Sequence, residues 1–550
     1  MRVALAQMNA VLGDFSGNRE KIISFARRAL DRRCDLVVFP EHALFGYLPT
    51  DLLERGSIVE AQLRELKRLE KELPKGILVL VGCVTFADDK RTSKQATGRT
   101  LGKGVAESLS VKRYYNSAAL MERGKKTRFF HKERLASFDV FDEARHYRSG
   151  ELSKNRFKLK GKTVQVTICE DIWGWGQREN ELKKVKRSGV DLVVNLSASP
   201  FTKTKRARRH DVLKKTVAHF KAPAVYVNMV GGQDEIVFDG RSVIMDKKGK
   251  VRGELVAFQE DLGVYDLETE ETGYRESFAE IEILRLALVQ GIRDFALKTG
   301  LGRCHFGLSG GIDSAVVACL AVDALGPQAV TAITLPGPFN DPSSRVWAEK
   351  LASQLGIQCL NIEIEPAYEA LKNSFEGATG LNEFGLVHEN LQARTRGVLL
   401  MAYSNLSSSL LLSTGNKAEY AAGYSTLYGD QCGGLAPLGD LLKSEVYELA
   451  RYYNSQAEVI PSEIIDRPPS AELRPGQKDQ DSLPPYDELD AAVVRIIERR
   501  EPARTKTETW LLNASLKSEF KRWQAAPILK VSDHAFGRGR RLPIAHRAKD

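Results

Sequence analysis

A short glycine- and serine-rich segment near the middle of the chain constrains its fold more than any other feature. It reads Phe306-Gly307-Leu308-Ser309-Gly310-Gly311-Ile312-Asp313-Ser314. The apolar lead-in and the apolar run that follows predict a strand, a tight loop and a helix. Adjacent glycines let backbone amides point inward, and the positive end of a helix favours an anion. The segment therefore predicts a phosphate-binding loop, with an ordinary glycine-rich turn of a parallel sheet as the alternative.

The ending of this loop narrows the class of nucleotide chemistry. It lacks the Gly-Lys-Ser/Thr ending of a Walker loop, which argues against the phosphate contacts of kinases and GTPases. The pattern Ser-Gly-Gly-x-Asp-Ser resembles the PP-loop of the ATP pyrophosphatases, which cleave ATP between the α and β phosphates. The resemblance implies that the loop holds the departing pyrophosphate and that Asp313 helps to hold Mg²⁺.

Length and composition predict a two-domain enzyme of the cytoplasm. A chain of 550 residues exceeds one core, so two domains of about 250 residues each are expected. The N-terminus runs directly into a strand pattern, and no apolar run is long enough to span a bilayer, so we expect no membrane association. The seven cysteines include no C-x-x-C pair, which argues against disulfides and structural zinc. A special cysteine is then expected to be a nucleophile.

The charge balance does not require a nucleic-acid partner. The net charge of +10 comes from 81 basic and 71 acidic side chains, a mild excess that a phosphate-rich small molecule explains equally well. Basic clusters occur at 203–209 and 538–541, but they lack interleaved aromatic residues. Solvated faces or anion sites are the favoured interpretation, and no nucleic-acid partner is expected.

In the first half of the chain, ionisable residues end three apolar runs. Strand-like and helical patterns alternate up to about residue 267, which predicts a layered α/β fold. Glu41, Lys132 and Cys169 each follow such a run, and strand ends are where α/β folds collect their chemistry. A cysteine attacks as its thiolate, so a carboxylate base and a nearby cation would serve it. Taken singly, a core cysteine and a surface lysine are the commoner interpretations.

Together these residues and their neighbours resemble the Glu-Lys-Cys triad of the nitrilase superfamily. The resemblance rests on the segments 39–41, 131–135 and 168–173 and implies an αββα sandwich. It implies Glu41 as general base, Lys132 as the cation that stabilises the intermediate, and Cys169 as the nucleophile that forms a thioester. It also places Phe138, Ser199 and Lys205 at a glutamine substrate, although Phe138 stands where relatives usually carry a tyrosine.

The second half predicts a nucleotide-binding sheet. Acidic residues accumulate at 268–271, so we expect domains at 1–265 and 281–550 with a linker at 266–280. A long helical run at 281–297 precedes the phosphate-binding loop. Strand patterns at 329–335 and 358–364 then flank a helix at about 344–354. This alternation predicts a doubly wound parallel sheet with a nucleotide at its carboxyl edge.

Polar segments beyond the loop extend the resemblance to the glutamine-dependent NAD synthetase family. They are 389–396, 412–419, 437–443 and the proline-rich 467–475. The resemblance implies a carbon–nitrogen ligase that uses ATP, Mg²⁺, deamido-NAD and glutamine. The resemblance assigns ATP to residues 307–314 and Thr414, and deamido-NAD to Asn390, Arg394, Glu419 and Lys521, with Arg394 at its phosphates. It assigns the metal to Asp313, and a metal ligand is the alternative role of Glu419. The segment 336–339 departs from the serines and tyrosine of relatives.

The implied reaction explains why two domains share one chain. Adenylation gives the carboxylate of deamido-NAD a good leaving group, and neutral ammonia, under about one per cent of the ammonium pool at pH 7, must then attack. Ammonia released at Cys169 and guided through a dry channel avoids that loss. We expect a homo-oligomer. The alternatives are another PP-loop amidotransferase, an RNA-binding or tRNA-modifying protein, and a nitrilase-type amidase with a regulatory second half.

Overall fold

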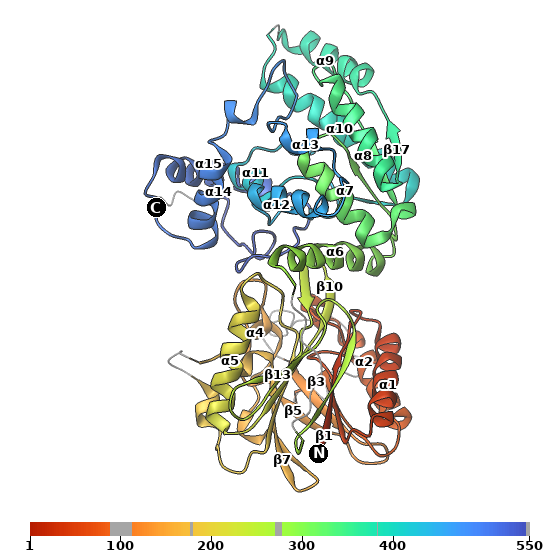
Figure 1. Ribbon diagram of the computed structural model, residues 1–550, viewed down its shortest axis with the longest axis vertical. Helices are drawn as coiled ribbons and strands as arrows, with labels where there is room; N and C mark the ends of the chain where they lie inside the picture. Colours follow the sequence, from red (N-terminus) through yellow and green to blue (C-terminus); the bar gives the residue numbers. More distant parts are fainter. Residues whose placement is uncertain (88–112, 176–179, 270–277, 382, 546–550) are drawn as a thin grey trace, which may run out of the picture. The chain divides into compact units, whose positions relative to one another are not determined.

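The chain divides into two compact units. The computed structural model describes residues 1–87, 113–175, 180–269, 278–381 and 383–545 (Figure 1). One unit comprises residues 1–233 and 238–277, and the other comprises 234–237 and 278–550. The predicted linker lies partly outside the described residues and stays a prediction. Among the described helices, none is long and apolar enough to cross a membrane.

The first unit is built on two six-stranded sheets. Their strand orders are β14-β1-β2-β3-β4-β5 and β13-β12-β9-β8-β7-β6. The first sheet contains β1 (Arg2–Gln7), β2 (Leu36–Val38), β3 (Leu78–Phe86), β4 (Tyr114–Met121), β5 (Arg128–His131) and β14 (Asp261–Asp266). The second contains β6 (Arg156–Leu159), β7 (Lys162–Ile168), β8 (Leu192–Ser197), β9 (Ala224–Asn228), β12 (Val243–Met245) and β13 (Val251–Glu254). Two further strands, β10 (Val230–Gln233) and β11 (Ile236–Asp239), lie between β9 and β12 in the sequence and pair with each other.

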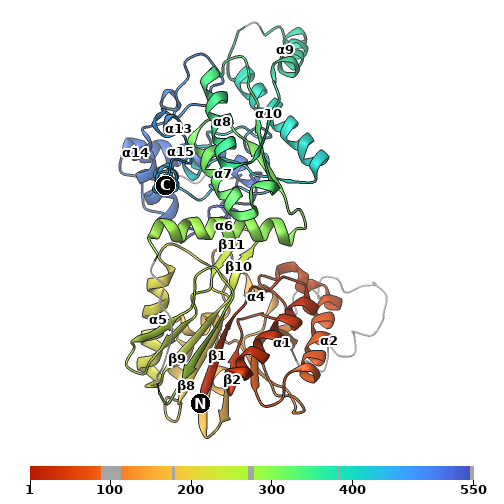
Figure 2. The same ribbon diagram turned by 45° about the vertical axis from the view of Figure 1, so that its right-hand side comes forward.

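Apolar faces of both sheets form one core between them. Val3, Leu36, Val166, Val194 and Val225 belong to this core and are at most 1% exposed. Helices α1 (Phe15–Asp31) and α2 (Gly56–Glu72) pack on the first sheet, and α5 (Lys205–Phe220) packs on the second (Figures 1 and 2). The predicted αββα sandwich is thereby confirmed.

The second unit contains a parallel sheet in the order β17-β16-β15-β18. Its strands are β15 (Cys304–Gly307), β16 (Val330–Thr334), β17 (Gln358–Asn361) and β18 (Leu410–Leu411). The chain leaves β15 toward β16 and β17, and returns to β18 on the other side of β15. Strand order therefore reverses beside β15, and ligands of doubly wound folds bind at such a switch point.

Helices surround this sheet and account for most of the second unit. Helix α7 is apolar on all sides, and it is buried because it packs against α6, α8 and α12 as well as against the sheet. The helices are α6 (Glu280–Lys298), α7 (Ile312–Leu325), α8 (Pro342–Leu355), α9 (Glu365–Thr379), α10 (Leu386–Ser407), α11 (Lys417–Ala422), α12 (Lys443–Tyr453), α13 (Ser462–Asp466), α14 (Tyr486–Ala492) and α15 (Lys506–Trp523).

Candidate active sites

The three ionisable residues predicted in the first unit lie together at the ends of their strands. Glu41 follows β2, Lys132 follows β5 and Cys169 follows β7, so two come from one sheet and the third from the other. The Lys132 Nζ donates a hydrogen bond to the Glu41 Oε1 at 2.8 Å. Glu41 and Lys132 are fully buried, and Cys169 is 8% exposed. The sandwich thus excludes most water from this group.

Lys132 lies between two carboxylates, one of which carried no role in the sequence prediction. Besides Glu41, its Nζ contacts both oxygens of Glu143, at 2.9 and 2.8 Å. Asn116 donates to the Oε1 atoms of both glutamates, at 2.7 and 3.1 Å. Burial opposes the charge of Lys132, but the Glu143 and Glu41 carboxylates outweigh it and hold its pKa well above the usual value. Lys132 is therefore a fixed cation in a dry site.

The Cys169 thiol is held in a sharp turn. Its φ of +42° lies in the left-handed region, which is unusual for a residue with a Cβ. Asp171, fully buried two residues later, accepts hydrogen bonds from the Ile168 N at 2.8 Å and from the Glu133 and Arg134 N atoms at 3.0 and 2.9 Å. This carboxylate ties the turn of Cys169 to the segment that follows Lys132. Burial raises the pKa of Asp171 to about 7.

Electrostatics keep the Cys169 thiol protonated at rest. Burial, followed by the negative charge of Glu41, raises its pKa well above the ordinary value, and Lys132 offsets only part of this rise. A nucleophilic attack from this thiol requires a base that takes its proton. Glu41 is the neighbouring carboxylate, and its Oε2 is held in place by the Ala198 N at 3.0 Å.

The residues predicted at the glutamine substrate lie in two loops and at the start of a helix. Ser199 follows β8 and is buried, and Asn228 holds its backbone through the Ser199 N at 2.9 Å and the Ser199 O at 3.3 Å. Lys205 begins α5, with its Nζ 4.0 Å from the centroid of the Trp173 ring. Phe138 is 53% exposed and packs on Phe141. Their role at glutamine stays a prediction.

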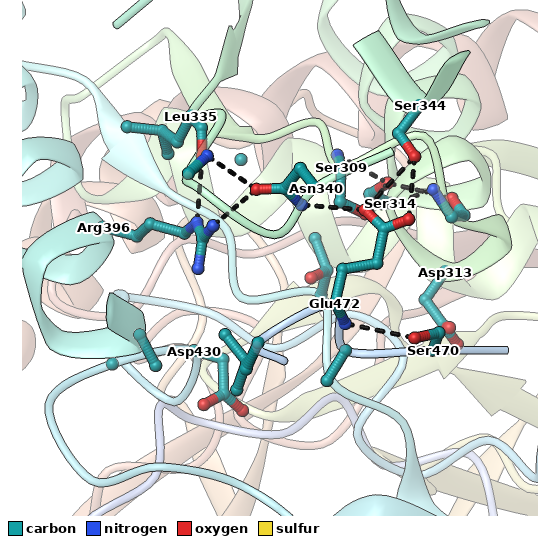
Figure 3. A pocket seen from close by; sticks show the side chains of 18 of the residues that line it. Ser309, Asp313, Ser314, Leu335, Asn340, Ser344, Arg396, Asp430, Ser470 and Glu472 are labelled. Carbon is teal, nitrogen blue, oxygen red and sulfur yellow. Dashed lines mark hydrogen bonds between the residues drawn. The ribbon is translucent and has the colours of Figure 1, made fainter. Parts of the chain in front are cut away.

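The second unit contains a cavity of about 1020 Å³ at the carboxyl ends of β15, β16 and β18 (Figure 3). Its walls include most of the predicted ATP-binding residues: Gly307, Leu308, Ser309, Gly311, Ile312, Asp313, Ser314 and Thr414. Gly310 is not among the lining residues. Its φ is +78°, and a Cβ there would lie 2.3 Å from the Ser344 O, so the loop requires glycine at this point.

Hydrogen bonds within the loop fix its shape. The Ser314 Oγ accepts from the Ser309 N at 3.2 Å and donates to the Gly311 O at 2.9 Å. The Gly311 N donates to the Ser309 Oγ at 3.2 Å. Helix α7 begins at Ile312, directly behind the loop, so its N-terminus faces the same cavity wall. This arrangement suits a phosphate group.

Two carboxylates predicted for the metal lie beside this loop. Asn416 donates from its Nδ2 to the Asp313 Oδ1 at 3.0 Å, and its Oδ1 accepts from the Glu419 N at 3.1 Å. The Lys443 Nζ forms an ion pair with Asp313 and lies 3.8 Å from the Glu419 Oε1. Burial, together with the Asp313 charge, raises the pKa of Glu419 to about 8. The described residues form no group of three or more His, Cys, Asp or Glu side chains that could hold a metal.

The residues predicted for deamido-NAD divide into two groups. Asn390, Glu419 and Lys521 line the cavity. The Asn390 Oδ1 accepts from the Thr426 Oγ1 at 2.7 Å, and the Lys521 Nζ donates to two backbone carbonyls. Arg394 is exposed and not among the lining residues, and its Nε donates to the Leu427 O at 3.2 Å. The structure therefore brings three of the four together.

Sequence reasoning gave no role to several charged residues of these sites. Lys443, Arg467 and Glu472 lie in segments named above for their resemblance to relatives, and Glu143 lies in the short segment 141–143, which also resembles relatives. Their position in those segments was the available signal. The sequence signal for Arg396 was weaker, because Arg394 lies two positions earlier on α10 and only the fold distinguishes the two arginines.

Comparison with known families separates the chain at the same place as the fold. A family model described as carbon–nitrogen hydrolase matches residues 2–274, and one described as NAD synthase matches residues 285–525. Both sites described above lie within these matches.

Full-length relatives carry both parts in one chain. A glutamine-dependent NAD(+) synthetase of Synechocystis is 43% identical over 99% of this chain and 98% of its own length. The protein of the same name from Xanthomonas campestris is 38% identical over 99% and 97%. The solved structure of the Acinetobacter baumannii synthetase, in complex with adenosine diphosphate, has a TM-score of 0.76 and 32% identity over 99% of this chain and 98% of that one.

Proposed function

The chain belongs to the family of glutamine-dependent NAD(+) synthetases, and we propose how its residues divide the work between the two units. It makes NAD from deamido-NAD with nitrogen taken from glutamine. The observation that carries our assignment is the buried Glu41–Lys132 pair, with a Cys169 thiol whose pKa burial keeps high. This group supplies the base, cation and nucleophile that amide hydrolysis needs.

Glutamine hydrolysis would begin with transfer of the Cys169 proton to Glu41 as the sulfur attacks the side-chain amide carbon. A C–S bond forms, and the carbonyl electron pair becomes an oxyanion that the Lys132 ammonium stabilises. Collapse of this intermediate breaks the C–N bond, and ammonia leaves with the proton from Glu41. Water then hydrolyses the thioester to glutamate. Glu143 keeps Lys132 charged throughout, because it contacts the same Nζ from another side.

The amino-acid end of glutamine would lie at Ser199 and Lys205, because a hydroxyl and an ammonium suit an α-carboxylate. The Ser199 backbone is fixed on both sides by Asn228, which supports a positioned contact. Phe138 would contribute an apolar face only, since it has no hydroxyl group.

NAD synthesis would take place in the cavity of the second unit. A carboxylate oxygen of deamido-NAD attacks the α-phosphorus of ATP, and pyrophosphate leaves into the loop 307–314. Ammonia then attacks the adenylated carbon, forming the amide and releasing AMP. Thr414 would contact ATP, and Asn390, Glu419 and Lys521 would contact deamido-NAD. The adenosine diphosphate in complex with the Acinetobacter baumannii relative supports adenine-nucleotide binding by this chain.

Magnesium would be held by Asp313 and Glu419. Mg²⁺ binds through one or two carboxylates together with substrate phosphates, so two carboxylates beside a phosphate-binding loop fit this ion. A cation already lies against both, because the Lys443 Nζ contacts Asp313 and approaches Glu419. When bound, the ion would neutralise charge on the pyrophosphate that leaves.

Self-association in the cytoplasm is also part of the proposal. Helix α10 exposes Val398, Met401 and Leu406, at 66%, 42% and 82%, along one face. Exposed apolar residues at helical spacing support contact with a second copy. Light scattering on the wild type and on Leu406→Glu tests this self-association. A charged side chain within such an interface should separate the copies, so the variant is expected to form smaller particles than the wild type.

The first experiment compares glutamine with ammonium chloride as the nitrogen donor. NAD formation from deamido-NAD, ATP and Mg²⁺ is measured for the wild type, Cys169→Ala and Cys34→Ala, a buried cysteine at the end of α1. We expect Cys169→Ala to use ammonium alone and Cys34→Ala to use both donors. NAD from glutamine in Cys169→Ala would contradict the assigned nucleophile, and no NAD from either donor in the wild type would contradict the synthesis itself.

A further inference from the structure

A guanidinium group reaches the cavity of the second unit without an ionic partner. Arg396 belongs to α10 and lines the cavity. Its Nε donates to the Leu335 O at 3.0 Å, and its Nη2 donates to the Asn340 Oδ1 at 2.8 Å. Figure 3 shows its remaining nitrogen directed away from these two acceptors. Both acceptors are uncharged, and no described carboxylate forms an ion pair with Arg396.

The lack of a carboxylate is unusual for a cation in this position. Burial lowers the pKa of Arg396 to about 10, and the negative charge of Glu472 offsets only part of that fall. Two other enclosed arginines of this unit are paired with carboxylates, Arg467 with Glu472 and Arg522 with Glu519. A buried charge is costly unless an opposite charge accompanies it. An anionic ligand in the cavity would supply that charge.

Asn340 and Gly337 hold the Arg396 guanidinium in one orientation. The Asn340 Oδ1 also accepts from the Gly337 N at 2.7 Å, and the Asn340 Nδ2 donates to the Glu472 Oε2 at 2.8 Å. A Cβ at Gly337 would lie 2.9 Å from the Arg396 Nη2 and 3.0 Å from the Ile364 Cδ1. Glycine at this position therefore leaves room for the guanidinium.

The arginine two positions earlier is the natural comparison. Residues two apart on a helix point in very different directions. Arg394 is exposed and bonds to the Leu427 O, whereas Arg396 faces the cavity. Leu335 directly follows β16, the neighbour of the strand that carries the phosphate-binding loop. Arg396 and that loop therefore lie at the same edge of the sheet.

We propose that Arg396 binds a phosphate group of a nucleotide substrate. The inference rests on the proposed function, because that function brings two phosphate-bearing substrates, ATP and deamido-NAD, into this cavity. A planar guanidinium with two nitrogens already fixed presents its remaining N–H groups to a phosphate oxygen in one orientation. Either substrate supplies the required oxygen, and the experiment separates them.

The test is equilibrium binding to the full-length chain. Wild type, Arg396→Gln, Arg396→Lys and the matched control Arg293→Gln are titrated separately with ATP, deamido-NAD and adenosine. Arg293, on α6, donates to the Ala324 O at 2.9 Å and the Asp323 O at 3.1 Å and is not among the residues that line the cavity. We expect Arg396→Gln to weaken binding of at least one phosphate-bearing substrate 10- to 100-fold, with adenosine affected less than twofold. Arg396→Lys retains the charge but not the fork of donors, so an intermediate loss is expected. Arg293→Gln should change no affinity more than twofold.

Each outcome decides the question. A loss confined to ATP or confined to deamido-NAD supports the inference and identifies the substrate. An equal loss for adenosine and ATP makes Arg396 structural. Unchanged affinities in Arg396→Gln, or an equal loss in Arg293→Gln, overturn the inference. If Arg396→Gln does not fold, as judged by its unfolding temperature, Arg396→Lys decides. A wild type that forms no NAD with ammonium would instead refute the proposed function.

Discussion

Removal of Arg209 offers a quantitative test of how the first unit holds the segment at Ser199, which is predicted to contact glutamine. Arg209 lies on α5, is 1% exposed, and donates from Nη2 to the Asp239 Oδ1 at 2.9 Å and from Nη1 to the Asp239 Oδ2 at 3.2 Å. The same Oδ1 accepts from the Nδ2 of Asn228, which holds the Ser199 backbone. Arg209→Met keeps the aliphatic stem but leaves a buried carboxylate without its cation.

The magnitude follows from this geometry. Breaking a buried ion pair on one side costs about 3–5 kcal/mol, because the remaining charge stays desolvated. Asn228 still donates to Asp239 at 3.3 Å, which places the expected loss near the lower end, about 3 kcal/mol. For a unit of this size, 1 kcal/mol corresponds to a shift of about 2–4 °C in the unfolding temperature. We therefore expect the transition of the first unit to fall by about 6–12 °C.

Scanning calorimetry of the full chain measures this shift. Residual glutaminase and ammonium-dependent activities, sampled after heating, identify which unit has unfolded at each transition. The control is Lys215→Met on the same helix, whose pair with Asp211 is exposed at 50% and 59%. An exposed pair of this kind contributes about 0.3–0.5 kcal/mol, so its shift should stay below about 2 °C. Equal shifts for the two variants would refute the reasoning.

Three further predictions concern other contacts of the two sites. Glu143→Gln removes one of the two negative charges that contact the Lys132 ammonium. Glutamine-dependent NAD formation should then fall at least about 10-fold while the ammonium-dependent rate is unchanged. Burial lowers the pKa of His42 from 6.5 to about 4. As the pH falls, the unfolded state therefore takes up a proton at His42 before the folded state does. The contribution of His42 to the free energy of unfolding is complete above about pH 6.5 and falls by about 3 kcal/mol toward pH 4. His42→Gln should therefore show a smaller decline in unfolding temperature over this pH range. Asn416→Ala removes the cap of α11 and the bond to Asp313, so the unfolding free energy should drop by about 1 kcal/mol and the Mg²⁺ concentration for half-maximal ammonium-dependent rate should rise.

Local patterns predicted the elements that carry the chemistry. The strand, loop and helix around the phosphate-binding segment became β15, the loop and α7, because glycine and serine between two apolar runs leave few other conformations. The run at 281–297 became α6 (Glu280–Lys298). Glu41, Lys132 and Cys169 were recognised because each follows an apolar run, and the structure brings Glu41 and Lys132 into direct contact.

The partners of these residues could not be read from the sequence. Glu143 contacts Lys132 only because the segment after β5 turns back, with the Ala136 N donating to the Glu143 Oε2 at 2.8 Å. Asn116, on β4, reaches Glu41 across 75 positions of sequence. Such contacts depend on strand order and register, which no local pattern encodes.

The two arginines of α10 show most clearly what each level of structure determines. By itself, the sequence determined that both lie on one helix near a nucleotide site. Only the tertiary structure decided that Arg396 faces the cavity and Arg394 faces outward. Both side chains are polar, so the apolar pattern of the helix does not distinguish them, and the rotation of the helix is set by its packing against α9, β18 and β15. The sequence specifies which side chains are available, and the packing of distant strands and helices decides which of them meet a ligand.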